Sequence, residues 1–164
     1  MIITSEEVNV LKLQFRSVIE KTFNAAPPES CKLTFRDGDD LSNVIADIEP
    51  FDSYCAPIDA RLLCNYGVVL KVGRGAVFEL PLKGRRYTKL EFNKELELLC
   101  TAVIEGHFLE TVDIVDGEIV GAIGRIDVPD VAKPVKDAWA KIGKTLFRKK
   151  TRVQYSYSPY HSPS

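Results

Sequence analysis

The chain has 164 residues, of which 45% are apolar and 27% charged, and its net charge is −1. These values are ordinary for one globular domain, and a chain of this length buries roughly 70% of its unfolded surface, so it can fold without a metal or a disulfide. No apolar run approaches the roughly 20 residues of a membrane span and no signal-peptide pattern opens the chain, so we expect a cytoplasmic protein without membrane contact.

A helix is predicted at the start of the chain. Thr4 and Glu7 form the T-x-x-E pattern of a capping box, and apolar residues recur at helical spacing until Pro27 and Pro28. The alternation of apolar and polar side chains over residues 31–37 then predicts a half-buried strand.

The next segment is predicted to be helix and loop. Apolar residues at helical spacing indicate one short helix over 41–48, with Asp39 or Asp40 as its N-cap. These apolar residues are Leu41, Val44, Ile45 and Ile48. Residues 50–66 are predicted to form a loop with a helical turn near 59–64.

A first hairpin is predicted over residues 67–82. Two β-rich runs are joined there by the residues Gly73-Arg74-Gly75, which suit a bulged turn. Pro81 cannot donate a backbone hydrogen bond, so it favours an edge position for the second strand.

A second helix and a second hairpin follow. The apolar stripe over residues 90–103 predicts a helix that stops at Gly106. The strands 107–115 and 118–128 flank Asp116-Gly117, a pair that is typical of a type I′ turn and would set Ile114 opposite Ile119. Gly121 and Gly124 indicate a bulge.

The C-terminal part of the chain is predicted to be less regular. Residues 131–150 fit a basic amphipathic helix, and residues 151–164, rich in Tyr, Ser and Pro, fit a flexible tail, with a short edge strand at 154–158 as the alternative. The rest, residues 1–130, is expected to be one domain. The fold class is therefore α+β: an antiparallel sheet of about five strands, two hairpins plus one, with helices packed on it.

Charge is divided unevenly along the sequence. From residue 132 onward, eight Lys or Arg stand against one Asp, a net charge of +7, whereas the other 14 basic and 22 acidic residues give −8. Residues 37–59 hold seven acids and no Lys or Arg. The candidate partner-binding residues are the acidic residues Asp37, Asp39, Asp40, Asp47, Glu49 and Asp52 and the basic residues Lys141, Lys144, Arg148, Lys149, Lys150 and Arg152.

Three interpretations of this division stay open. The basic segment can lie on the acidic one, or both can be solvated faces, and exposed charge pairs contribute only about 0–1 kcal/mol each. Residues 141–160 could contact a nucleic acid through phosphate contacts and tyrosine stacking, but no nucleic-acid-binding module is visible, so this is not favoured. The acidic segment could instead receive a basic protein partner, with complementary charge speeding the encounter.

No motif for a metal or a cofactor stands out. The cysteines Cys31, Cys55, Cys64 and Cys100 are scattered among apolar residues without a C-x-x-C pair, so we expect buried free thiols and no metal site. Residues 37–48 fail the pattern of a calcium loop, because positions six and twelve are not Gly and Glu.

Catalytic groups are equally sparse. The weak candidate is His107, which has Glu105 and Glu110 nearby as carboxylate neighbours for a general base. We therefore favour a non-enzymatic interaction protein, of the adaptor or toxin-neutralising type, with a protein partner. The alternative from another class is a small enzyme or ligand-binding domain with a pocket near His107 or near the Lys83–Arg86 loop.

Overall fold

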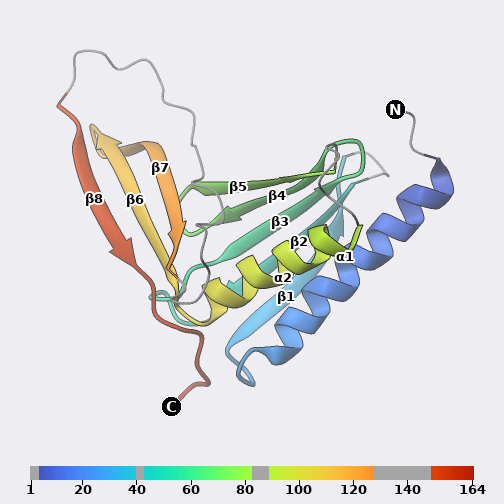
Figure 1. Ribbon diagram of the computed structural model, residues 1–164. Coiled ribbons are helices and arrows are strands. Elements are labelled where there is room, and N and C mark those ends of the chain that lie inside the picture. The colour runs from blue at the N-terminus through green and yellow to red at the C-terminus, as the bar shows by residue number, and fades with distance from the viewer. Residues whose placement is uncertain (1–3, 40–42, 83–88, 128–148) are drawn as a thin grey trace.

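A five-stranded antiparallel meander forms the larger sheet of the protein. This computed structural model describes residues 4–39, 43–82, 89–127 and 149–164, and only the backbone of 89–92. Each strand of the sheet pairs with the next strand in sequence (Figure 1). The strands are β1 Cys31–Asp37, β2 Val44–Pro50, β3 Ile58–Leu63, β4 Gly67–Val72 and β5 Ala76–Pro81.

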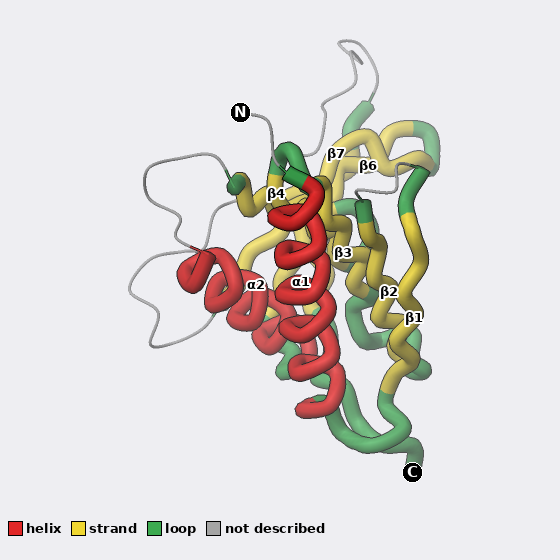
Figure 2. The backbone as a smooth tube through the Cα atoms, turned by 90° about the vertical axis from the view of Figure 1, so that its right-hand side faces the viewer, coloured by secondary structure: helices red, strands yellow, loops and turns green. Residues whose placement is uncertain are grey.

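One face of this sheet is covered by two helices, α1 Ser5–Ala25 and α2 Lys89–Ile104 (Figure 2). Every second strand residue is apolar and buried, since side chains alternate between the two faces of a strand. Phe15 and Ile19 from α1 and Leu99 from α2 are at most 1% exposed and complete this core. Burying a side chain of that size contributes about 1.5–3 kcal/mol, so the interface between the helices and the sheet stabilises the fold.

The predicted capping box at the start of α1 is confirmed. Thr4 Oγ1 accepts a hydrogen bond from the Glu7 backbone N–H, and the Glu7 carboxylate accepts one from the Thr4 backbone N–H. These bonds satisfy two of the backbone donors that a helix start leaves free.

The helix predicted over 41–48 is wrong, and so is the helical turn predicted near 59–64, whereas residues 51–57 of the predicted loop do form a loop. Residues 44–50 form β2, and residues 58–63 form β3 in the middle of the sheet. In β2, Val44, Ala46 and Ile48 are fully buried, so the apolar residues follow a period of two, which the helical spacing concealed.

The second hairpin forms a separate sheet of three strands. Its strands β6 Phe108–Val115 and β7 Glu118–Ile126 are joined at Asp116 and Gly117, whose positive φ values of 53° and 82° confirm the type I′ turn. Ile114 pairs with Ile119 as predicted, and the register shifts after Asp113 because Val120 is an extra residue in β7. The third strand, β8 Thr151–Ser156, pairs with β6.

The α+β class with an antiparallel sheet of five strands is confirmed. The strands β1, β4 and β5 are the expected ones, whereas β2 and β3 take the places that the second hairpin was expected to fill. The short edge strand considered for the end of the chain corresponds to β8. The basic helix predicted over 131–150 lies outside the described residues except for its last two. Neither of the two described helices is long and apolar enough to cross a membrane.

A buried carboxylate joins the two sheets. Glu110 of β6 has no solvent exposure. It accepts hydrogen bonds of 2.8–2.9 Å from the backbone N–H groups of Arg74 and Gly75 in the β4–β5 turn and of Ala76 at the start of β5. The hydroxyl of Tyr157 donates a fourth bond of 2.6 Å, and burial together with this bond raises the tyrosine pKa. With four donors on two oxygens, the buried charge is satisfied.

Candidate functional site

The last eight residues pack against a loop in the first half of the chain. We call residues 157–164 the C-terminal segment and residues 51–57 the β2–β3 loop. The Ser158 backbone N–H donates to the Tyr54 carbonyl at 2.9 Å, and the Tyr160 hydroxyl donates to the Ala56 carbonyl at 2.6 Å. Tyr160 is 3% exposed, and burial raises its pKa.

Two further bonds fix the segment to other parts of the fold. The Tyr160 backbone N–H donates to the Ile104 carbonyl at the end of α2, and the Ser162 hydroxyl donates to the Pro28 carbonyl before β1, both at 2.8 Å. The C-terminal segment therefore closes one end of the molecule, beside the start of β1 (Figure 2).

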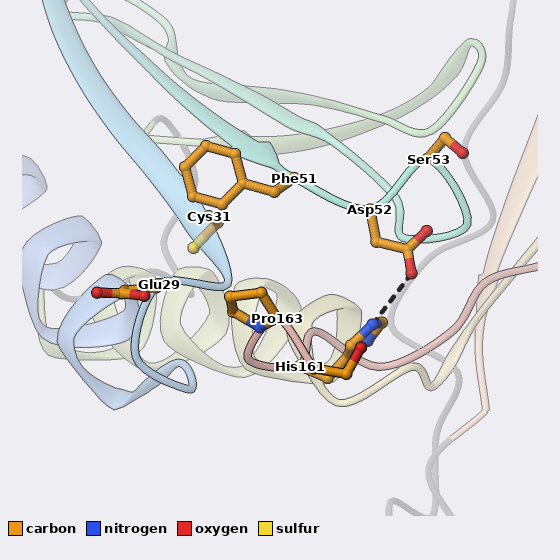
Figure 3. A pocket seen from close by; sticks show the side chains of 8 residues that line it. Glu29, Cys31, Phe51, Asp52, Ser53, His161 and Pro163 are labelled. Carbon is orange, nitrogen blue, oxygen red and sulfur yellow. Dashed lines mark ion pairs between the residues drawn. The ribbon is translucent and has the colours of Figure 1, made fainter.

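An open pocket of about 850 Å³ lies between the segment and the loop (Figure 3). It is lined by Glu29, Cys31, Phe51, Asp52, Ser53, His161, Pro163 and Ser164. Phe51 has 69% of its surface exposed, and Tyr54 three residues later has 74%. An aromatic pair this exposed beside a concave surface is typical of a binding site.

Three possible metal ligands meet at this pocket. The ligand atoms of Asp52, Cys55 and His161 lie within 4.8 Å of one another. Asp52 Oδ2 is 3.0 Å from His161 Nε2, as the dashed line in Figure 3 marks. Cys55 is buried, its Sγ–H donates to the Pro159 carbonyl at 3.4 Å, and its pKa is raised by burial and by the nearby Asp52 and Cys31.

The sequence prediction missed this cluster. Asp52 and Cys55 do have the close spacing of a ligand pair, D-x-x-C, but this spacing is neither a C-x-x-C pair nor part of a calcium-loop pattern. His161 could not be added from spacing, because the hydrogen bonds of the C-terminal segment bring it to the loop from 109 positions away.

Two of the six predicted acidic residues form ion pairs with arginines of the chain itself, and two more have a His or Lys as a neighbour. Asp47 is 3.0 Å from Arg36 on the neighbouring strand, and Asp37 is 4.0 Å from Arg16. Asp52 pairs with His161, and Glu49 lies directly opposite Lys32 in the β1–β2 register. Asp39 is exposed, and Asp40 lies outside the described residues.

These acidic residues are not gathered on one patch. Asp37 pairs with Val44 at one end of the β1–β2 ladder, whereas Asp52 follows the other end, where Cys31 pairs with Pro50. A seven-residue strand spans roughly 20 Å, so the two carboxylates lie on opposite sides of the molecule. Acidic residues of β2 and β3 share the open face of the sheet with basic residues. On this face, the hydrogen bond from Arg61 lowers the pKa of the Asp59 carboxyl.

The described basic candidates lie around the smaller sheet. Lys150 and Arg152 bind the mostly buried Asp113 at 2.6 Å and 2.8 Å, and their hydrogen bonds lower the pKa of Asp113 to about 2. Lys149 is exposed. Three further candidates, Lys141, Lys144 and Arg148, lie outside the described residues.

The weak catalytic candidate His107 is a surface residue. Its Nε2 is 3.9 Å from Glu105, both side chains are more than one-third exposed, and it does not line the pocket of Figure 3. The Lys83–Arg86 loop lies outside the described residues. All four cysteines are buried free thiols, as predicted, and complete burial raises the pKa of Cys100 to about 12, far from the range of an activated nucleophile.

Comparison of the chain with protein-family models, with curated proteins and with solved structures finds no match. Any function must therefore be argued from the geometry of the pocket, the β2–β3 loop and the C-terminal segment.

Proposed function

We propose that this protein is a non-enzymatic interaction protein that binds a segment of a protein partner in the pocket beside the β2–β3 loop. The observation that supports this function is the exposure of Phe51 and Tyr54 at 69% and 74%. Leaving two large aromatic rings in water is unfavourable, and aromatic anchors next to a pocket are typical of binding hot spots.

The lining of the pocket suggests the chemistry of the partner segment. Phe51 and Pro163 offer apolar surface, while Glu29 and Asp52 add carboxylates near it. A segment that carries an apolar side chain next to a Lys or Arg complements both features. The acidic side chains on the open sheet face have basic neighbours, so we place the contact at the pocket and not over residues 37–49.

The function is tested by co-purification with a matched pair of variants. Tagged protein is isolated from its native host, and stoichiometric partners are identified by mass spectrometry. We expect a partner to be retained by the wild type and reduced about tenfold or more by Phe51→Ser/Tyr54→Ser, since hot-spot truncations cost about 2 kcal/mol or more. The control is Ile119→Ser/Ile123→Ser, which removes two exposed apolar side chains of β7.

The outcomes separate the possibilities. Equal recovery of the partner by both double variants would place the contact elsewhere, and the absence of any stoichiometric partner after cross-linking would argue against an interaction protein. For a basic partner segment, affinity measured with the purified partner should fall as salt is raised.

A further inference from the structure

We propose that Asp52, Cys55 and His161 form a binding site for one divalent transition-metal ion of the zinc class. The inference does not rest on the proposed function, because all three ligands belong to this chain and the purified protein is sufficient to test it. The β2–β3 loop supplies two ligands, and the C-terminal segment supplies the third.

The distances fit such an ion after small movements. Zinc bonds of about 2.0–2.3 Å in tetrahedral geometry place ligand atoms roughly 3.3–3.8 Å apart. The three candidate atoms lie within 4.8 Å of one another, and Asp52 Oδ2 and His161 Nε2 are 3.0 Å apart. Side-chain rotations that move each ligand atom by less than one or two bond lengths are therefore enough to bring all three atoms to one ion.

Hydrogen bonds to neighbouring groups already orient the ligand side chains, as the outer-shell groups of a metal site do. His161 Nδ1 lies 3.1 Å from the Pro159 carbonyl, so it donates there and leaves Nε2 for a metal, the arrangement typical of metal-bound histidine. Asp52 Oδ1 accepts from the Tyr54 backbone N–H at 2.8 Å, which leaves Oδ2 facing His161. The anchors at Tyr160 and Ser162, on either side of His161, hold its backbone in place.

The donor set selects the class of metal. Imidazole nitrogen with thiolate sulfur and one carboxylate oxygen suits zinc and its neighbours, whereas magnesium and calcium prefer oxygen ligands throughout. Metal binding would release the Cys55 thiol proton to solvent, and the resulting thiolate and the Asp52 carboxylate together balance the charge of a divalent cation. Asp52 and His161 line the open pocket, so an ion can enter from solvent and a water can complete four-coordination.

The test uses the untagged chain of 164 residues titrated with Co²⁺ and with Zn²⁺. Co²⁺ reports a thiolate ligand through a charge-transfer absorption in the near ultraviolet, and Zn²⁺ should displace it at one equivalent. We expect the charge-transfer band to be absent from Cys55→Ser and the affinity for Zn²⁺ to fall at least about tenfold in His161→Ala and Asp52→Asn. His107→Ala and Cys64→Ala are the matched controls and should titrate like the wild type.

Loss of folding does not obscure this test. The His161 side chain is 52% exposed, so its removal should leave the fold intact, and circular dichroism checks each variant. No Co²⁺ or Zn²⁺ binding by the wild type would overturn the proposal. Unchanged binding in His161→Ala would do the same, because it would show that the metal binds adventitiously elsewhere.

Discussion

Glu110 holds the β4–β5 turn against β6 through bonds from three backbone N–H groups and one tyrosine hydroxyl. In Glu110→Gln, an amide NH₂ replaces one carboxylate oxygen and faces donors that it cannot satisfy. We expect the free energy of unfolding to fall by about 2–3 kcal/mol, measured by urea denaturation.

The matched control is Glu105→Gln, in which an exposed carboxylate near the end of α2 is replaced. It should change stability by about 0.5 kcal/mol or less. Equal effects of the two substitutions would mean that the bonds from the β4–β5 turn contribute nothing measurable to the joining of the sheets.

The roles of such residues could not be predicted from the sequence. From the sequence, Glu110 is merely a carboxylate near His107, because nothing in its local pattern indicates the residues 34 to 36 positions away that it binds. The same applies to His161 and Asp52. By contrast, the capping box of Thr4 and the turn at Asp116 and Gly117 were predictable, since their geometry depends on neighbours in sequence.

Among the elements, β2 shows where local pattern was insufficient. Leu41, Val44, Ile45 and Ile48 satisfy a helical period, whereas Val44, Ala46 and Ile48 satisfy a period of two equally well. Pairing with both β1 and β3 decides in favour of the strand, and this tertiary contribution is invisible in a window of seven residues. For the same reason, the local pattern does not show that β6 and β7 belong to a separate sheet, since this depends on which strands pair in the folded chain.

The attachment of β8 to β6 should depend on pH through Asp113. Its pKa is lowered from 3.8 to about 2 by hydrogen bonds from Arg152 and Lys150, so the ionised carboxylate favours the folded state. This stabilisation is complete above the unfolded pKa near 4 and is lost as pH falls through about 2. The stability difference between wild type and Asp113→Asn should therefore shrink between about pH 4 and pH 2.

Urea denaturation at a series of pH values measures this dependence. Asp127→Asn serves as the control, since Asp127 is an exposed acid just after β7. If the difference in the free energy of unfolding between wild type and Asp113→Asn stayed constant from pH 6 to pH 2, the ion pairs of Asp113 would not stabilise the attachment of β8.

For the whole molecule, the division of charge along the sequence does not correspond to two opposed surfaces among the described residues. Arg36 and Arg61 lie among the acids of the open sheet face, and Lys150 and Arg152 are engaged by Asp113. With a net charge of −1, we expect no binding of fluorescent single-stranded DNA at about 0.1 M salt. Fluorescence anisotropy measures this, and tight binding that weakens steeply with salt would restore the nucleic-acid hypothesis for residues 141–160.

The packing of the C-terminal segment also has a consequence during translation. Tyr160 and the Ala56 carbonyl that it binds are 104 residues apart, so at 5–20 residues per second the tyrosine is synthesised roughly 5–20 s after the loop. Throughout that interval the nascent chain presents the Cys55 thiol and the adjoining apolar residues without their final cover. The growing polypeptide thus leaves open to oxidation and to premature association a thiol and an adjoining alanine that are buried in the finished protein.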